Sequence, residues 1–304
     1  MHSEQQLLDR LRRRIVIPEA SGVVLGIGDD CAIVRPPGAD EDLLFTTDML
    51  IENVHFLRET HAPADIGHKA LARGLSDIAA MGGSPRFCLL SLALPEWAGD
   101  AWVDSFYCGL LDLASRTGTA LAGGDLARSE RLTCDITVCG AVPHGEALLR
   151  SGAKPGDEIY VSGLLGESML GFETRRGKPW KKHLRPEPRI GLGRYARERL
   201  HASAAMDLSD GLSLDLHRLC LASGVSAHLE AVPAHSRMVK PRHYLHGGED
   251  YELLLTVPPT TPVPDEIGGV PFTCLGRIEE GAPGEVLMFG LPLRALGYDH
   301  FRNL

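Results

Sequence analysis

The pattern of apolar and polar residues predicts helices and strands throughout the first half of the chain. Residues 63–81 are rich in alanine and are followed by a glycine pair, which predicts a helix. Residues 87–94 form a continuous apolar run that ends at a proline, as expected of a central strand, and residues 132–139 alternate with a period of two, which is typical of a half-buried strand. The other elements predicted here are a short buried strand over 43–47, a helix over 97–115 and a strand over 119–122.

The character of the sequence changes after Pro143. Residues 151–157 are rich in turn-forming residues, and a new strand is predicted over 158–161, so we place a domain boundary near 145–152. The elements predicted after it are helices over 167–176, 189–200 and 212–222, a basic loop over 177–188, and strands near 226–230, 251–257 and 272–278. Strands and helices mixed in both halves predict an α+β protein with two α/β-type domains, 1–148 and 149–304.

Composition narrows the class of protein. The chain has 304 residues, enough for two domains with sizeable cores, and a formal net charge of −9, which disfavours a nucleic-acid partner. The polar first residues lack the apolar core of a secretion signal, and no apolar run approaches the roughly 20 residues of a membrane span. The seven cysteines include no Cys-x-x-Cys pair, which favours reduced thiols. We therefore expect a cytoplasmic protein that binds neither nucleic acid nor membrane.

Acidic clusters flanked by glycine recur along the chain, mostly where an apolar run meets glycine and thus at predicted strand ends and turns. A single acid in such a place is usually a turn former. Six clusters in one chain instead predict a site that gathers hard cations, because Mg²⁺ prefers carboxylate oxygens and substrate phosphates, and so favour phosphoryl transfer from a magnesium-bound nucleotide. The clusters are Gly26-Ile27-Gly28-Asp29-Asp30, Thr46-Thr47-Asp48, Ser76-Asp77, Gly123-Gly124-Asp125, Asp207-Leu208-Ser209-Asp210-Gly211 and Gly247-Gly248-Glu249-Asp250.

The familiar nucleotide-binding loops are absent from the sequence. The segment 26–31 lacks the third glycine of a dinucleotide-binding loop, and residues 32–37 do not favour the helix that should follow it. No glycine is followed by the lysine and hydroxyl residue of a Walker A loop, and the catalytic loops of protein kinases are missing. A phosphoryl transferase with this sequence must therefore use another architecture.

Asp77 has the strongest case for function among the single residues. On the predicted helix it follows Lys69 and Arg73 at intervals of four residues, so the three share one face. The alternative is a surface Arg73–Asp77 pair of little energetic value. The neighbours of Asp77 are apolar, however, which predicts a buried carboxylate that needs a partner, and a metal ion is one such partner.

The other clusters each have a structural alternative. Asp207, Ser209 and Asp210 precede the predicted helix 212–222, where one of them could serve as its N-cap, but two acids and a hydroxyl exceed what a cap needs. The glycines before Asp125 could let backbone amides approach an anion, or could be ordinary strand-to-turn residues. Arg150 could contact phosphate or lie on the surface, and His55 could contact substrate or lie in the core.

Together these segments resemble the thiamine-monophosphate kinase family, within the aminoimidazole-ribonucleotide-synthetase-like superfamily. The resemblance extends over nearly the whole chain, and the number, order and spacing of the segments make it specific. Beyond the clusters above, the matching segments are 53–56, 90–95, 150–157, 183–189 and 297–301. The resemblance implies the fold of that superfamily and a homodimer in which the sheets of residues 1–148, the dimerisation and nucleotide- and metal-binding domain, form a barrel-like interface.

The resemblance also implies in-line transfer of the γ-phosphoryl group of ATP to thiamine monophosphate, with several Mg²⁺ ions, giving thiamine diphosphate. The positions that match metal ligands are Asp30, Thr46, Thr47, Asp48, Asp77, Asp125, Asp207 and Asp210. Those that match contacts to ATP are Gly124, Asp125, Arg150 and Ser209, and those that match contacts to the thiamine phosphate are His55, Glu249 and Tyr298. Catalysis is assigned to Asp48, Asp125, Arg150 and Asp210, whereas Asp29 is expected to hold its loop.

One departure from the family pattern follows Asp125. The family usually continues with two threonines, where this chain has Leu126 and Ala127, so two hydroxyl groups are lost. The alternatives to the kinase are another ATP-dependent enzyme of the superfamily and a nucleotide-binding relative without catalysis. A non-catalytic relative would be expected to have lost acids from the clusters, and none is lost, which favours an enzyme.

Overall fold

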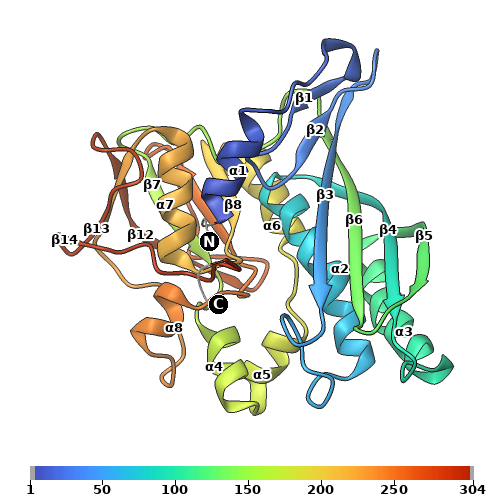
Figure 1. The fold of residues 1–304 in the computed structure, drawn as a ribbon. Helices are drawn as coiled ribbons and strands as arrows, with labels where there is room; N and C mark the ends of the chain where they lie inside the picture. Colours follow the sequence, from blue (N-terminus) through green and yellow to red (C-terminus); the bar gives the residue numbers. More distant parts are fainter. Residues whose placement is uncertain (1–3, 302–304) are drawn as a thin grey trace.

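The protein contains two β-sheets that occupy different halves of the molecule, in a computed structural model that describes residues 4–301 (Figure 1). The first sheet lies within residues 23–143 and the second within residues 158–292. Helices and strands mix in both halves, which confirms the expected mixed class. None of the helices in the described part combines the length and the apolar composition that crossing a bilayer requires.

The first sheet has six strands in the order β1-β2-β3-β6-β4-β5. Neighbouring strands are antiparallel except β4 and β5, whose parallel pairing needs a crossover connection that helix α3 (Asp100–Thr117) supplies. The strands are β1 (Val23–Leu25), β2 (Ala32–Val34), β3 (Glu41–Ile51), β4 (Ser84–Leu94), β5 (Ala120–Arg128) and β6 (Thr133–Pro143).

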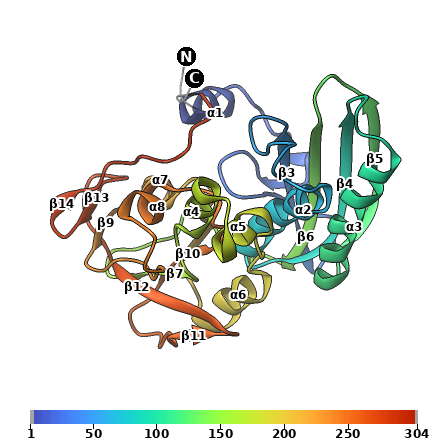
Figure 2. The ribbon, with the colours of Figure 1, turned by 90° about the horizontal axis from the view of Figure 1, so that it is seen from below.

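Helix α2 (Pro63–Ala80) lies between the two sheets (Figure 2). It contacts β3 and β6 of the first sheet and β8 (Ala204–Asp207) of the second. Its small residues permit close packing on both sides: a Cβ atom at Gly74 would lie 2.6 Å from Cγ2 of Val138 in β6, and one at Gly67 would lie 2.0 Å from the carbonyl oxygen of Phe106 in α3. Most of its residues are buried, and the predicted helix over 63–81 is confirmed.

The second sheet has eight strands, of which seven follow the order β14-β13-β9-β12-β7-β10-β8, while β11 pairs with β12. Its remaining strands are β7 (Glu158–Ser162), β9 (Ser226–Leu229), β10 (Leu253–Val257), β11 (Glu266–Ile267), β12 (Val270–Glu279), β13 (Val286–Met288) and β14 (Leu291–Pro292). The other helices are α1 (Glu4–Arg12), α4 (Glu167–Thr174), α5 (Gly177–Leu184), α6 (Ile190–Tyr195), α7 (Leu212–Ser223) and α8 (Pro241–His246), with a 3₁₀ turn at Glu19–Ser21 and a π-helical turn at Ala196–Leu200.

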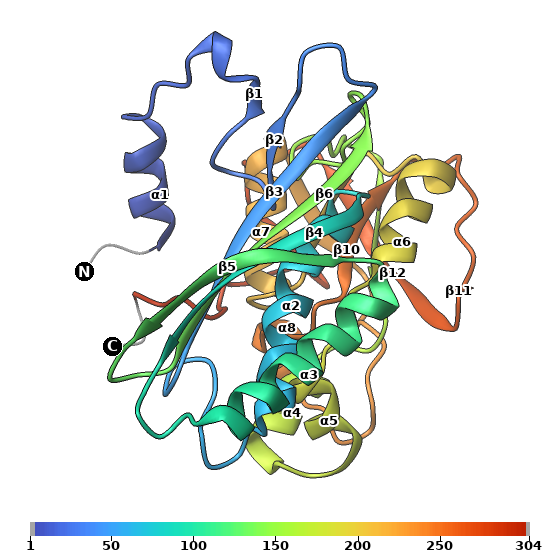
Figure 3. The same ribbon diagram turned by 90° about the vertical axis from the view of Figure 1, so that its right-hand side faces the viewer.

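One face of the first sheet is covered by helices and the other is open. Along β3, Thr46 and Leu50 are buried, whereas Met49 is exposed. Leu89 on β4 is exposed on the same face, because it lies two residues from Ser91, and Ser91 pairs with Asp135, the partner of Met49. Figure 3 shows β3, β6, β4 and β5 side by side, with α1 standing away from them. Each chain therefore leaves apolar side chains on this open face.

Three predictions of local structure are corrected. The segment 177–188, predicted as a loop, contains helix α5, because Trp180 stacks on the buried ring of His183 with the ring centroids 5.1 Å apart. The glycines of residues 123–125 lie within β5 rather than at its end: Gly124 has a φ of 154°, and a Cβ atom there would lie 1.8 Å from the carbonyl oxygen of Leu90. Residues 46–48 lie within β3, which is longer than predicted.

Candidate functional site

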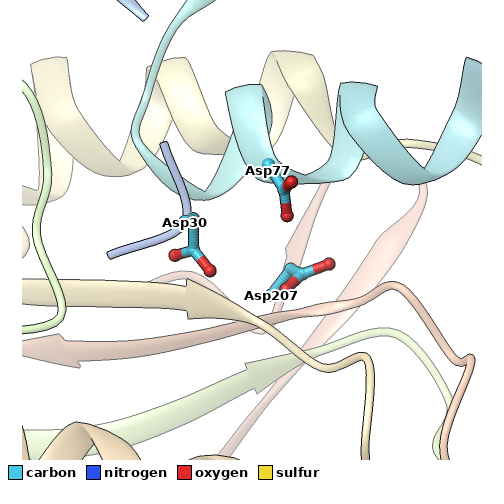
Figure 4. Close-up of side chains that lie close together, drawn as sticks. All are labelled: Asp30, Asp77 and Asp207. Carbon is cyan, nitrogen blue, oxygen red and sulfur yellow. The ribbon is translucent and has the colours of Figure 1, made fainter. Parts of the chain in front are cut away.

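Three aspartates from distant parts of the chain converge between the two halves. Asp30 lies in the loop before β2, Asp77 lies near the end of α2, and Asp207 ends strand β8. Figure 4 shows their carboxylates turned toward one another, and one oxygen of each lies within 4.8 Å of the others. We call these residues the acidic trio.

The electrostatics of the acidic trio favour a bound cation. Burial, and then the charges of Asp48, Asp207 and Asp30, raise the pKa of Asp77 well above its ordinary value. Burial and then the charge of Asp30 raise the pKa of Asp207 in the same direction. Oδ2 of Asp30 is buried without a hydrogen-bond partner. Clustered carboxylates with an unsatisfied buried oxygen fit a hard cation such as Mg²⁺.

Neighbouring side chains hold the acidic trio in place. The hydroxyl of Thr46 on β3 donates to Oδ2 of Asp77, and the hydroxyl of Ser76 donates to Oδ2 of Asp207 at 2.7 Å. Arg150, which was predicted to contact ATP, pairs with Asp30 through Nη2 and, at 3.2 Å, through Nε.

The backbone amide of Arg150 donates to the carboxylate of Asp29 at 3.1 Å. This contact agrees with the expected role of Asp29, which is to hold its loop. The loop before β2 is thereby tied to the segment that joins the two halves, next to the acidic trio.

Two further predicted ligands, Asp48 and Asp210, each pair with an arginine. Oδ1 of Asp48 lies 2.8 Å from Nη2 of Arg73, so Arg73 pairs with Asp48 rather than with Asp77. Oδ2 of Asp210 lies 2.5 Å from Nη1 of Arg218 on α7. Neither arginine was predicted to belong to the site.

The capping alternative for the turn before α7 is wrong. Its N-cap is Gly211, without a side-chain hydrogen bond. The amides of Asp210 and Gly211 instead bond to Oδ2 of Asp215, at 3.1 and 2.9 Å. The side chains of Asp207, Ser209 and Asp210 are therefore not used as the helix cap.

Thr47 and Asp125 are not brought to the acidic trio. The hydroxyl of Thr47 donates to Oδ1 of Asp135 on β6, at 2.9 Å. Asp125 on β5 pairs in register with Ser91, which pairs with Asp135. Residues paired across neighbouring strands point to the same face of a sheet, so these side chains lie on the open face, beside Gly124.

The residues predicted to contact the thiamine phosphate lie near one another. His300, which sequence reasoning missed, joins two of them: its ring centroid lies 5.1 Å from that of His55 and 4.7 Å from that of Tyr298. The backbone amide of Tyr298 donates to the carbonyl oxygen of Asp210 at 3.1 Å. Glu249 is linked to the same turn, because its amide donates to the carbonyl oxygen of Ser209 at 2.7 Å.

A buried lysine supports Glu249. Nζ of Lys69 lies 2.9 Å from Oε2 of Glu249, and the lysine side chain is 1% exposed. Burial raises the pKa of the Glu249 carboxyl, but Lys69, His183 and Arg73 together outweigh burial and lower this pKa to about 2. The spacing of Lys69, Arg73 and Asp77 was the signal in the sequence that could have placed both basic residues in the site.

A protein-family model and curated relatives both match this chain. The model of the AIR synthase related protein N-terminal domain matches residues 28–142. The chain is 41% identical to the thiamine-monophosphate kinase of Escherichia coli (strain K12), with 92% of both chains covered. It is 34% identical to that of Bacillus subtilis (strain 168), with 93% of this chain and 95% of the relative covered.

Two solved structures resemble this chain over nearly its whole length. A structure described as AaThiL complexed with AMPPCP and TMP is 32% identical and superimposes with a TM-score of 0.85, over 98% of this chain and 97% of that one. The thiamine monophosphate kinase structure from Aquifex aeolicus is 31% identical, with a TM-score of 0.79 over 96% of this chain and 99% of that one. The chain therefore belongs to the thiamine-monophosphate kinase family.

Proposed function

We propose that this protein phosphorylates thiamine monophosphate with ATP to give thiamine diphosphate. The acidic trio carries the proposal, because it places clustered carboxylates beside the residues expected to contact the acceptor. The family relatives support the reaction, and a similar structure is described as a complex with the nucleotide analogue AMPPCP and TMP. The proposed substrates are therefore ATP and thiamine monophosphate.

We propose that Mg²⁺ ions accompany the nucleotide. The acidic trio, with Asp48 and Asp210, would hold them, and the buried unpaired oxygen of Asp30 supports this assignment. When bound, Mg²⁺ would offset the negative charge of the phosphates that must approach each other. Thr46 orients Asp77 for this task, and Ser76 orients Asp207.

The other residues would bind and orient the two substrates. Arg150 adds fixed positive charge next to Asp30, and Ser209 lies at the turn before α7, where nucleotide contact is proposed. His55, Glu249 and Tyr298 would hold the acceptor. The acceptor is already a phosphate and so a competent nucleophile at neutral pH. Direct in-line transfer then requires no covalent intermediate with the enzyme and no strong general base.

We also propose a homodimer built on the open face of the first sheet. Exposed Met49 and Leu89 give this face the apolar character of an interface. Pairing of two such faces would give the expected barrel-like arrangement, with residues 1–148 as the dimerisation and nucleotide-binding domain and residues 149–304 as the second domain. The contacts expected from Gly124 and Asp125 would then form between the copies, not within one chain.

A cytoplasmic location is proposed on the basis of the cysteines. All seven are free, and five of them are buried. Free thiols persist in reducing compartments, whereas oxidising ones favour disulfides.

The first test is a product assay. Purified protein would be incubated with thiamine monophosphate, ATP and Mg²⁺, and the thiamine species would be separated by chromatography. Formation of thiamine diphosphate that stops on adding EDTA is expected, with no product from free thiamine. Absence of product, when nucleotide still binds, would contradict the proposed function.

A further inference from the structure

Helix α2 presents a row of charged side chains to the site. Lys69, Arg73 and Asp77 follow at intervals of four residues, so each lies about one turn from the next. Lys69 pairs with Glu249, at the end expected to hold the acceptor, and Asp77 belongs to the acidic trio at the other end. Arg73 therefore lies between the acceptor site and the metal site.

Not every N–H donor of the Arg73 guanidinium group is hydrogen-bonded within the protein. Nη2 lies 2.8 Å from Oδ1 of Asp48, and Nη1 lies 3.2 Å from the carbonyl oxygen of Met49. Nε is buried without a hydrogen-bond partner, and the side chain is only 15% exposed. A buried donor without an acceptor is costly, so the group is suited to a ligand rich in acceptor oxygens, such as a phosphate.

Pairing with Asp48 alone does not account for this arrangement. Elsewhere in the first half, Arg35 donates two parallel hydrogen bonds to Asp42, from Nε to Oδ1 at 2.7 Å and from Nη2 to Oδ2 at 2.8 Å. Such a two-pronged contact uses both carboxylate oxygens and is the strongest geometry for an arginine–carboxylate pair. Arg73 contacts only one oxygen of Asp48, which leaves the other oxygen able to accept a metal ion.

The positive charge of Arg73 interacts with titratable residues toward both the acceptor site and the metal site. Burial, and then the charge of Arg73, lower the pKa of His55 to about 3. Like Lys69, Arg73 lowers the pKa of Glu249. Burial lowers the pKa of Arg73, but Tyr251 and then Asp48, Glu249 and Asp77 together outweigh burial and raise it. Arg73 is thus a fixed cation between the groups that would hold the two substrates.

We propose that Arg73 binds the phosphate group of the acceptor and thereby selects a thiamine phosphate over free thiamine. The inference rests on the proposed kinase function. It assigns to Arg73 a specificity-determining contact: its unused N–H groups would donate to oxygens of the acceptor phosphate, while Asp48 holds the guanidinium in place. No bond is made or broken by this contact, which acts by binding and orientation.

The test compares two ligands that differ only in the phosphate. Binding of thiamine monophosphate and of free thiamine would be measured by calorimetry for the wild type, Arg73→Met and Arg73→Lys, with Arg86→Met as the control. Arg86 is an exposed arginine on β4 that pairs with Glu41. Arg73→Met is expected to weaken thiamine monophosphate by about tenfold or more and free thiamine by less than about twofold, because a hydrogen bond to a charged group is lost only with the phosphate.

The variants also separate this role from its rivals. If Arg73 served only to neutralise Asp48, Arg73→Met would lower the Mg²⁺ concentration needed for half-maximal activity and keep the affinity for thiamine monophosphate, which would overturn the proposal. Equal losses for both ligands would overturn it too. If Arg73→Met does not fold, Arg73→Lys decides the question, because lysine keeps the positive charge but lacks the planar guanidinium donors. Weaker binding of thiamine monophosphate with unchanged binding of free thiamine supports the proposal, and wild-type affinity for thiamine monophosphate refutes it. These are binding measurements, so an inactive wild type would contradict the proposed kinase function alone.

Discussion

Replacing Asp207 with asparagine is expected to make the metal-free protein more stable and the enzyme inactive. Asp207 is 1% exposed and belongs to the acidic trio, so its charge is buried beside two others. Asparagine has nearly the same shape and can still accept the hydrogen bond from Ser76. The substitution thus removes a charge while leaving the packing almost unchanged.

The size of the effect follows from the spacing of the acidic trio. At the 4.8 Å limit, two unit charges repel each other by about 3 kcal/mol for an effective dielectric constant of about 20. The raised pKa of Asp207 means that part of this repulsion is already relieved by a proton, so we expect a gain of about 1–3 kcal/mol in the free energy of unfolding. For a protein of this size, Tm should rise by roughly 2–10 °C.

The assay is thermal unfolding with and without Mg²⁺, together with the product assay. Asp207→Asn should raise Tm without metal, reduce the increase in Tm that Mg²⁺ causes, and lower kcat by about 100-fold or more, since a metal ligand is lost. Asp157→Asn is the matched control, because Asp157 is buried and accepts a hydrogen bond from the backbone amide of Lys154 at 2.9 Å. It should leave the response to Mg²⁺ unchanged. A lower Tm for metal-free Asp207→Asn, with a normal response to Mg²⁺, would refute the reasoning.

Four other outcomes are expected. Asp48→Asn should abolish turnover while the circular dichroism spectrum stays native, and wild-type turnover would remove Asp48 from the metal site. Gly124→Ala should disturb the pairing of β5 with β4 and reduce activity at least about tenfold, because its Cβ atom would meet the carbonyl oxygen of Leu90 at 1.8 Å; an active variant with an unchanged Tm would contradict this. Tyr298→Ala should raise KM for thiamine monophosphate more than KM for ATP, and unchanged KM values would exclude the assigned contact. Because the pKa values of Asp77 and Asp207 are raised, the folded metal-free protein binds more protons than the unfolded chain above about pH 4, and its stability falls as the pH rises toward those values. Mg²⁺ should therefore raise Tm more at pH 8 than at pH 6. Equal increases at the two pH values would contradict this direction of the pH dependence.

Local patterns were sufficient for many individual elements. The helix over 63–81 and the strands near 87–94 and 132–139 are present, because alanine-rich and alternating sequences have strong local preferences. The helix α5 was missed because its short sequence is basic and contains Gly177 and Pro179, residues that are typical of loops, whereas in the structure Trp180 packs on His183. The glycines of β5 were misplaced because glycine marks both turns and close strand contacts.

For the candidate site, the sequence by itself determined which residue types were available: acids flanked by glycine, and a helix whose charged residues recur every four positions. It could not determine which acids meet, since Asp30, Asp77 and Asp207 are separated by long stretches of chain and converge only when the two sheets pack around α2. Nor could it assign the cations Lys69, Arg73 and Arg218 to Glu249, Asp48 and Asp210. Those pairings depend on the distances between elements, because electrostatic and hydrogen-bond energies fall steeply with separation and only tertiary packing sets it.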